Sequence, residues 1–344
     1  MKIAVDAMGG DFAPDEIIKG IKLALNDFPD ISRFLLVGDS QCVRRSLIRN
    51  RLSDSDSRLE LVHASQVVKM SEPSAAAVRA KKDSSITVAA RLVKDKKAEA
   101  IVSAGHTGAA VASTVVTNRL LPGIERPGIA SVFPAPQGSF LMLDIGANVD
   151  CKPIHLAQYA IMGEAYAQIL FKLKEPKIGI LSIGGEDKKG NELTKGSYKI
   201  LSRLPINFVG NVEGRDLFSN NVDVVLCDGF VGNVVLKCCE SLAKAISGIL
   251  RENLKKSPVR MAGALLSKNA FKELKEITDH EEYGGAPLLG VNGICIIAHG
   301  SSSAKAIRNA IRVARDMLLN DYNLHISERI SGINWKQFTS EASG

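Results

Sequence analysis

The chain has 344 residues, of which 45% are hydrophobic, 24% charged and 5% aromatic, and 29 are glycines. This length and composition predict one large or two closely joined globular α/β domains, and they exclude a chain that is disordered over long stretches. The formal net charge of +7 indicates either a mildly basic solvated surface or an acidic partner, such as a carrier protein or an anionic lipid face.

The cysteines, the apolar runs and the spread of basic residues exclude further classes of protein. The six cysteines are Cys42, Cys151, Cys227, Cys238, Cys239 and Cys295. They form no CxxC pair and lie at no metal-ligand spacing from a histidine, which predicts free thiols in a reducing cytoplasm. No apolar run reaches the ~18 residues of a membrane span, and Met1 and Lys2 lead straight into a strand-like run rather than a signal peptide. The basic residues form no nucleic-acid-binding motif, so we expect a cytoplasmic protein with no nucleic acid partner.

Short β-rich runs alternate along the chain with longer segments of helical period. Strands are predicted at Lys2–Asp6, Phe34–Gly38, Leu59–His63, Ala100–Ser103, Phe140–Asp144, Lys177–Ser182, Asn207–Val209, Asp223–Cys227 and Ile294–Ala298. Helices are predicted at Asp15–Asp27, Gln41–Arg51, Ser74–Lys97 with a break, Thr107–Leu120, Pro153–Lys172, Glu192–Arg203, Asn233–Asn253 and Ser302–Leu319. This alternation is typical of an α/β protein with a mostly parallel, doubly wound sheet and helices on both faces.

Some segments interrupt the alternation. Leu121–Gly138 is rich in proline and glycine, which predicts a crossing loop or a sheet edge. Ser331–Gly344 is polar and predicts a frayed tail, which leaves residues 1–330 as a single domain. Leu254–Ile277 alternates apolar and basic residues near helical period. This amphipathic segment either packs on the core or a second subunit, or lies on an anionic membrane.

Glycine and small polar residues follow strand after strand. In an open α/β sheet, ligands bind beyond the carboxyl ends of the strands. The loops at these ends are Asp6–Asp11, Ser103–Gly108, Asp144–Asp150, Ser182–Asn191, Gly210–Asp216, Cys227–Asn233 and His299–Ser303. Glycines let backbone N–H groups approach an anion, and the helix amino termini that follow favour negative charge. Together the loops predict a crevice for an oxyanion.

The absence of standard motifs narrows the choice of ligand. No GxGxxG follows a strand, and in the segment Gly185–Asn191, which has the glycine spacing of a P-loop, Asn191 stands where lysine is required. The chain also has no HExxH, EF-hand loop or GxSxG elbow. We therefore expect a small oxyanion rather than a nucleotide as ligand, and no metal or other cofactor.

The loop sequences resemble those of a known family. The matching segments are DAMGGDFAP (Asp6–Pro14), SAGHTGA (Ser103–Ala109), LDIGANVDCKP (Leu143–Pro153), EDKKGNELTKG (Glu186–Gly196), GNVEGRD (Gly210–Asp216), CDGFVGNVVLK (Cys227–Lys237), YGGAPLLG (Tyr283–Gly290) and AHGSS (Ala298–Ser302). In this order, from Met1 to about Leu319, they resemble the bacterial phosphate acyltransferase family, PlsX.

The resemblance implies a reaction, a fold and partners. A fatty acyl group would pass from acyl carrier protein to inorganic phosphate, and the acyl phosphate would enter phospholipid synthesis. The implied fold is a three-layer α/β/α sandwich similar to that of isopropylmalate dehydrogenase and phosphotransacetylase, so residues 1–330 would form one catalytic domain. The family is typically homodimeric. Its amphipathic tip, which touches membrane in some members, corresponds to residues 254–277, so peripheral contact with the inner face of the cell membrane is expected.

The site residues are assigned within this reaction. We expect Lys188 to counter the phosphate charge and Asn233 to donate to phosphate or to the acyl carbonyl. His299 either protonates the departing thiolate or only bonds to a neighbouring turn. The expected substrate-binding residues are Asp6, Gly9, Gly10, Ser103, Gly105, His106, Thr107, Gly108, Asn148, Asp228, Gly229 and Gly232.

Two further residues invite a catalytic interpretation. His106 occupies a turn position where the family usually has asparagine, so we expect it to line the ligand wall or shape the turn rather than act as an essential base. Cys227 has the position of an acyl acceptor, but a cysteine that ends an apolar strand is more often a buried core residue.

Two other functions stay open at this point. One is a phosphotransacetylase-like enzyme that uses acyl-coenzyme A. The other is a non-catalytic adaptor for a carrier protein or a membrane surface, supported by the net charge and by Leu254–Ile277 alone. An adaptor has no use for so many polar strand ends, which disfavours it.

Overall fold

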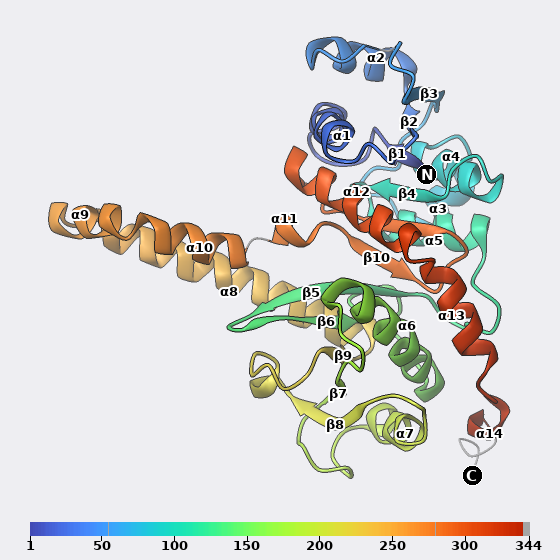
Figure 1. The fold of residues 1–344 in the computed structure, drawn as a ribbon, viewed down its shortest axis with the longest axis vertical. Helices are drawn as coiled ribbons and strands as arrows, with labels where there is room; N and C mark the ends of the chain where they lie inside the picture. The colour runs from blue at the N-terminus through green and yellow to red at the C-terminus, as the bar shows by residue number, and fades with distance from the viewer. Residues whose placement is uncertain (54, 279, 340–344) are drawn as a thin grey trace.

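One sheet of eleven strands crosses the molecule, with helices on both of its faces (Figure 1). The computed structural model describes residues 1–339 apart from 54 and 279, and it leaves undescribed the side chains of 274–280 and 339. The strand order is β3-β2-β1-β4-β11-β10-β5-β6-β9-β7-β8. The strands are β1 Lys2–Asp6, β2 Arg33–Gly38, β3 Leu59–His63, β4 Ala100–Ser103, β5 Gly128–Ala135, β6 Gly138–Leu143, β7 Ile178–Ser182, β8 Phe208–Glu213, β9 Val224–Leu226, β10 Ala286–Leu289 and β11 Ile294–Ile297.

The sheet has two parallel halves joined by antiparallel strands. In the first half, β2, β1, β4 and β11 pair in parallel, with β3 at the edge. In the second half, β6, β9, β7 and β8 pair in parallel. Between them, β10 runs antiparallel to β11 and β5, and β5 runs antiparallel to β6. The predicted α/β sandwich with a mostly parallel sheet is confirmed.

Helices on each face cover a separate apolar core. They are α1 Asp15–Asp27, α2 Ser40–Arg49, α3 Ser74–Ala80, α4 Ser85–Lys94, α5 Thr107–Asn118, α6 Pro153–Phe171, α7 Glu192–Leu201, α8 Gly229–Lys255, α9 Pro258–Leu266, α10 Lys268–Thr278, α11 His280–Tyr283, α12 Ala304–Leu319, α13 Tyr322–Ser331 and α14 Lys336–Thr339. One core lies under α1, α6 and α12, and the other under α3, α4 and α5. Strands β4 and β11 are buried along their whole length, which explains their continuous apolar sequences.

The segment Leu121–Gly138, predicted as a crossing loop or a sheet edge, is a loop only over residues 121–127, and it does not form an edge. It contains β5, which lies in the middle of the sheet between β10 and β6. Proline misled the prediction because it usually marks an edge. Here Pro134 lies near the end of the β5–β6 ribbon, opposite Ser139. Strand β10 was not predicted at all.

The carboxyl-terminal tail is also more ordered than its polarity indicated. Helix α13 carries the chain across the molecule, and α14 follows it (Figure 1). Phe338 is only 3% exposed, and the Arg203 guanidinium lies over its ring, 5.1 Å from the centroid. The prediction of a frayed tail is therefore wrong for residues 331–339, while residues 340–344 lie outside the described residues.

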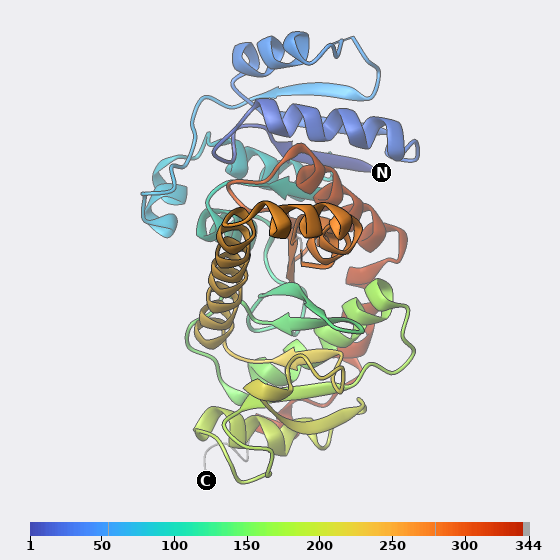
Figure 2. The same cartoon turned by 90° about the vertical axis from the view of Figure 1, so that its left-hand side faces the viewer.

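Helices α8, α9 and α10 form an arm that projects from the sheet and returns toward it (Figures 1 and 2). The predicted segment Leu254–Ile277 is divided among these helices rather than being one helix. Leu265 and Leu266 are 72% and 89% exposed, and no residue of α9 is buried. Packing of α9 on the core of its own chain is therefore excluded. The side chains of Leu274 and Ile277 lie outside the described residues.

Candidate active site

In the first half of the sheet, the loops that follow β1, β4 and β11 are joined by hydrogen bonds. We call these loops the first-half cluster. Asp6 is buried, and its carboxylate accepts hydrogen bonds from the Ser103 hydroxyl at 2.8 Å and from the Met8 N–H at 3.2 Å. The Gly105 N–H donates to the Ser103 hydroxyl at 3.1 Å. Burial raises the pKa of the Asp6 carboxyl, and hydrogen bonds from Ser85 and Ser103 oppose that rise. Asp6 therefore ties the loop after β1 to the loop after β4.

Glycine is required in this cluster because its loops touch through their backbones. A Cβ atom placed on Gly9 would lie 2.7 Å from both the Asp6 Oδ2 and the Gly105 nitrogen. Gly10 has φ +108°, a conformation that glycine adopts without strain. The Asp11 N–H donates to the Gly300 carbonyl at 2.8 Å, which joins the β11 loop to the others.

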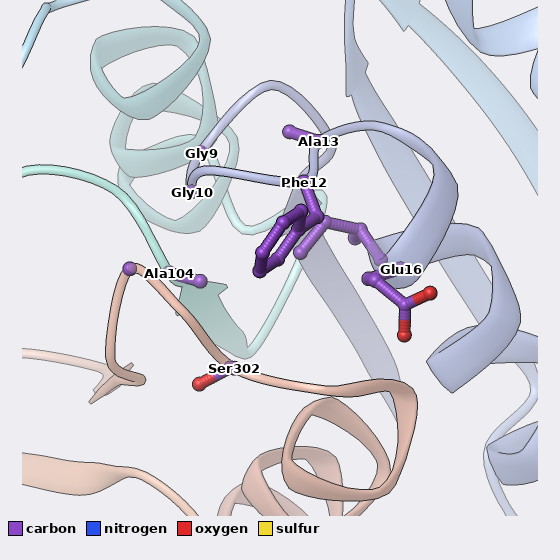
Figure 3. Close-up of a pocket in the computed structure, with 9 residues that line it drawn as sticks. Gly9, Gly10, Phe12, Ala13, Glu16, Ala104 and Ser302 are labelled. Atoms are coloured by element: carbon purple, nitrogen blue, oxygen red, sulfur yellow. The ribbon is translucent and has the colours of Figure 1, made fainter.

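A small recess opens beside these loops (Figure 3). Gly9, Gly10, Ala104, Gly300 and Ser302 contribute to its lining. The Phe12 side chain points toward Ala104 across it (Figure 3). The recess is too shallow to enclose even a water molecule, so no ligand is assigned to it.

His106 caps helix α5, and both of its ring nitrogens have partners. The Nδ1 atom accepts from the Ala109 N–H at 3.4 Å, and Nε2 lies 3.1 Å from the Glu72 carbonyl oxygen. This pattern fits a neutral ring with its proton on Nε2. It agrees with a turn residue and leaves no free ring nitrogen to act as a base. Thr107 is exposed in the first turn of α5, and Gly108 lies against Ser74.

His299 is exposed on the loop after β11. Its Nδ1 lies 2.8 Å from the Ser301 hydroxyl and accepts from the Ser301 N–H at 3.3 Å. This is the turn contact expected as the alternative to a catalytic role. The exposed ring is still accessible to a substrate, so its role as proton donor stays a prediction.

The second-half cluster is organised around a different aspartate, Asp144, which follows β6. Its Oδ1 accepts from the N–H groups of Ile129, Gly146 and Ala147 at 2.9–3.0 Å, and its Oδ2 accepts from the Asn148 N–H at 2.8 Å. The Asn148 carbonyl oxygen then accepts from the Gly229 N–H at 2.8 Å. The β6 loop is thereby linked to the amino terminus of α8.

Helix α8 begins one turn earlier than predicted. Asp228 is its amino-terminal cap and accepts from the Val231 N–H at 2.9 Å. Gly229 and Gly232 are buried, whereas Asn233 is exposed. A Cβ atom on Gly232 would lie 1.9 Å from the Asp144 carbonyl oxygen. Asn233 therefore lies within the helix. In the turn before it, the Gly229 N–H is already bonded to the Asn148 carbonyl and the Val231 N–H to the Asp228 carboxylate.

Two thiols lie beside this cluster, that of Cys227, which is buried, and that of Cys151, which is half-buried. The Cys227 Sγ donates to the Asp144 carbonyl oxygen at 3.4 Å, and burial holds the pKa of this thiol well above its usual range. Burial also raises the pKa of Cys151 to about 11. Neither thiol is a thiolate at neutral pH, which agrees with Cys227 as a core residue.

Lys188 lies apart from the hydrogen-bonded contacts of both clusters, exposed on the loop between β7 and α7. That loop is fastened to β8, since the Asn211 side-chain amide donates to the Glu186 carbonyl at 2.7 Å. Strand β7 pairs in parallel with β9, so the Lys188 loop and the start of α8 leave the same edge of the sheet.

Two buried residues beneath the site, Asp144 and Tyr159, were not predicted from the sequence. Asp144 stood in a strand-end loop but was not assigned a role. Tyr159, on α6, is fully buried; its hydroxyl accepts from the Asn148 side-chain amide at 2.8 Å and donates to the Pro127 carbonyl at 3.1 Å. A role for Asp144 could have been predicted by comparison with Asp6, because each aspartate ends an apolar run and precedes a loop that contains glycine.

Metal-binding and membrane-spanning features were also sought in the described part of the chain. Within residues 1–339 other than 54 and 279, histidine, cysteine, aspartate and glutamate form no group of three suited to a metal ion. Over the same residues, no helix has both the length and the apolarity that crossing a bilayer requires.

Two solved structures with a similar fold are named as a phosphotransacetylase and a phosphotransacylase. A phosphotransacetylase from Streptococcus pyogenes matches with a TM-score of 0.61 at 17% identity, covering 92% of this chain and 94% of its own. A branched-chain phosphotransacylase from Enterococcus faecalis matches with a TM-score of 0.56 at 15% identity, covering 92% and 99%. At these identities the likeness establishes the fold alone.

Sequence comparison gives a closer relation. The model of a family described as "Fatty acid synthesis protein" matches residues 1–325. A phosphate acyltransferase from Pelotomaculum thermopropionicum is 51% identical, covering 98% of this chain and 97% of its own. One from Desulfitobacterium hafniense is 49% identical, covering 96% and 98%. With its glycine-walled clusters and this match over nearly the whole length, the chain belongs to the phosphate acyltransferase family.

Proposed function

We propose that this enzyme transfers a fatty acyl group from acyl carrier protein to inorganic phosphate and releases acyl phosphate for phospholipid synthesis. The observation that carries the proposal is the pair of glycine-walled clusters, one in each half of the sheet, with exposed Lys188 on the loop after β7 and exposed Asn233 near the start of α8. Backbone N–H groups and a helix amino terminus suit a small dianion.

The proposed chemistry is a direct attack. A phosphate oxygen forms a bond to the thioester carbonyl carbon, the carbon–sulfur bond of the tetrahedral intermediate then breaks, and the pantetheine thiolate leaves and takes a proton, which His299 supplies. Holding phosphate beside the carbonyl lowers the barrier by as much as about 7–11 kcal/mol in well-oriented reactions. A preorganised donor to the oxyanion, the role proposed for Asn233, contributes roughly 3–4 kcal/mol. Lys188 counters the phosphate charge.

We further propose that a second copy of the chain and a membrane cover the arm. Apolar side chains of α8 and α9 are exposed, among them Leu242, Ile246, Ile249, Val259 and Leu266. Lys255, Lys256, Arg260 and Lys268 add positive charge to the same arm. These features support a homodimer formed along α8, with the α9 end in peripheral contact with anionic lipid at the inner face of the membrane, and a cytoplasmic location for the rest.

An assay with two donors tests the proposed function. The purified protein is incubated with phosphate and either long-chain acyl carrier protein or acyl-coenzyme A, and acyl phosphate and the free thiol are measured. Turnover with the carrier protein supports the proposal, and turnover restricted to the coenzyme A donor contradicts it.

The role of Lys188 is tested in the same assay. Lys188→Ala removes an exposed side chain, so the protein should fold normally. Loss of its charge should reduce kcat/KM about 100-fold, in the range found when one charge-stabilising group is removed. Lys189→Ala on the same loop is the matched control and should stay within about threefold of the wild type. Equal activities of the two variants would remove Lys188 from the mechanism.

A further inference from the structure

Asp144 is a fully buried carboxyl group for which the proposed chemistry has no direct use. It is 0% exposed, so it cannot touch a substrate. Its carboxylate oxygens accept from four different backbone N–H groups, on β5 and on the loop after β6. Burial raises the pKa of the carboxyl, and the backbone N–H donors oppose that rise. Because all four of these backbone groups are donors, the side chain at this position must accept hydrogen bonds, and a side chain with its own N–H donors would not fit.

The loop held by Asp144 is in contact with the start of α8. The Asn148 carbonyl accepts from the Gly229 N–H at 2.8 Å, while a Cβ atom on Gly229 would lie 2.6 Å from that carbonyl oxygen and 2.8 Å from the Asp144 Oδ2. A side chain at Gly146 would begin 3.9 Å from the Asn233 Cβ and Oδ1. The first turn of α8 therefore rests directly on Asp144 and its loop.

The backbone of Asp144 contacts α8 from the other side. The Asp144 N–H donates to the Cys227 carbonyl at 3.0 Å, and a Cβ atom on Gly232 would lie 1.9 Å from the Asp144 carbonyl oxygen. Both the side chain and the main chain of one residue thus meet the turn that leads to Asn233.

We propose that Asp144 is a positioning residue for phosphate binding: its carboxylate holds the loop 145–148 against Gly229 and so fixes the first turn of α8, and the Asn233 side chain that follows it, in the geometry that receives phosphate. The inference rests on the proposed function for the identity of the ligand. A displacement of the order of 1 Å at such a site costs about 100-fold in rate.

The test replaces Asp144 without changing its size. In Asp144→Asn, an amide NH₂ faces backbone N–H donors, so the loop must shift. We expect the Kd of inorganic phosphate, measured by calorimetry, and its KM to rise about tenfold or more, with the KM of acyl carrier protein changing less than about twofold. A loss of folded enzyme lowers the apparent kcat and leaves both KM values unchanged.

A matched control is available on α6. Glu164 is another buried carboxylate of the second half, paired with Arg329 far along the chain. Glu164→Gln should lower the melting temperature and leave the phosphate Kd unchanged. A folded Asp144→Asn protein with a wild-type phosphate Kd would overturn the inference. If that variant fails to fold, Tyr159→Phe decides instead, because it removes the hydroxyl that holds the Asn148 amide. A rise of about twofold to threefold in the phosphate Kd of Tyr159→Phe supports the inference, and an unchanged Kd overturns it.

A double-mutant cycle tests the route of the effect. If Asp144 acts through the turn that carries Asn233, Asp144→Asn should cost less than about twofold in kcat/KM in the Asn233→Ala background. Additive losses would contradict that route. Calorimetry needs no acyl donor, so a wild-type protein that binds phosphate but does not use acyl carrier protein contradicts the proposed function and leaves the inference to be decided by the phosphate Kd values.

Discussion

The two halves of the sheet build their loops around buried aspartates that are held in different ways. Asp6, in the first half, accepts from the Met8 N–H and also from a side chain, the Ser103 hydroxyl, which joins the loop after β1 to the loop after β4. Asp144, in the second half, depends on backbone N–H groups of its own loop and of β5. A side-chain donor is removed by one substitution, whereas backbone donors are not. The first cluster should therefore be adjustable in small steps, and the second should respond sharply to changes at Asp144 or at the glycines that touch it.

The largest effect should come from the second half, at Gly232. Gly232→Ala would place a Cβ atom 1.9 Å from a backbone carbonyl, which must move the first turn of α8. We expect activity to fall about 100-fold or more and stability to fall by about 1–3 kcal/mol, measured by steady-state kinetics and urea unfolding.

Gly248 provides the control for this prediction on the same helix. Nothing lies within 4 Å of a Cβ atom placed there. Gly248→Ala should keep its activity and gain roughly 0.5–1 kcal/mol, because alanine is the better helix former. An active Gly232→Ala enzyme would show that the tight contact with Asp144 is dispensable.

A smaller and graded effect is expected for the glycines of the first half. A Cβ atom at Gly9 would meet Asp6 and Gly105 at 2.7 Å, whereas one at Gly105 would have its nearest neighbours at 3.3 Å. Gly9→Ala should therefore reduce kcat/KM about tenfold, and Gly105→Ala less than about threefold. The reverse order would mean that the two loops do not meet as described.

The last effect, on stability rather than on activity, should depend on pH and involves Ser103. Because burial raises the pKa of Asp6 above its ordinary 3.8, this carboxyl favours the folded state at low pH, and that contribution is lost as the pH rises toward its folded pKa. Ser103→Ala removes a donor to the ionised form and should raise the pKa further. The variant should be destabilised by about 1–3 kcal/mol at pH 8 and by less at pH 4, measured by thermal unfolding. A larger loss at pH 4 would contradict this assignment.

The sequence predicted the first half better than the middle of the sheet. Continuous apolar runs such as Ala100–Ser103 identify buried parallel strands whatever surrounds them. Strand β5 was missed because the prolines in and around it indicate an edge, and its central position depends on pairing with the distant strand β10. The end of the chain was misjudged for a related reason: the burial of Phe338 depends on Arg203, far away in the sequence.

The candidate site was predictable as a set of loops but not as two clusters. Glycines at strand ends are visible in the sequence, and so is the small polar character of their neighbours. Gly229 and Gly232 are required because a Cβ atom added to either would lie 1.9–2.8 Å from an atom of Asp144. Asp144 follows β6 and the glycines follow β9, and the sequence does not reveal that these two strands are neighbours in the sheet. The early start of α8 also follows from tertiary contacts, since Asp228 caps it after β9 has ended.

The central claim is that phosphate attacks the thioester directly, without an acyl-enzyme intermediate. The buried Cys227 and half-buried Cys151 thiols, whose pKa values are raised by desolvation, support it. The most direct measurement mixes the enzyme at high concentration with acyl carrier protein and follows the free carrier thiol, first without phosphate and then after its addition. The account predicts no release of thiol until phosphate is added. A burst of thiol equal to the enzyme concentration in the absence of phosphate, with the acyl group recovered on the protein, would contradict it.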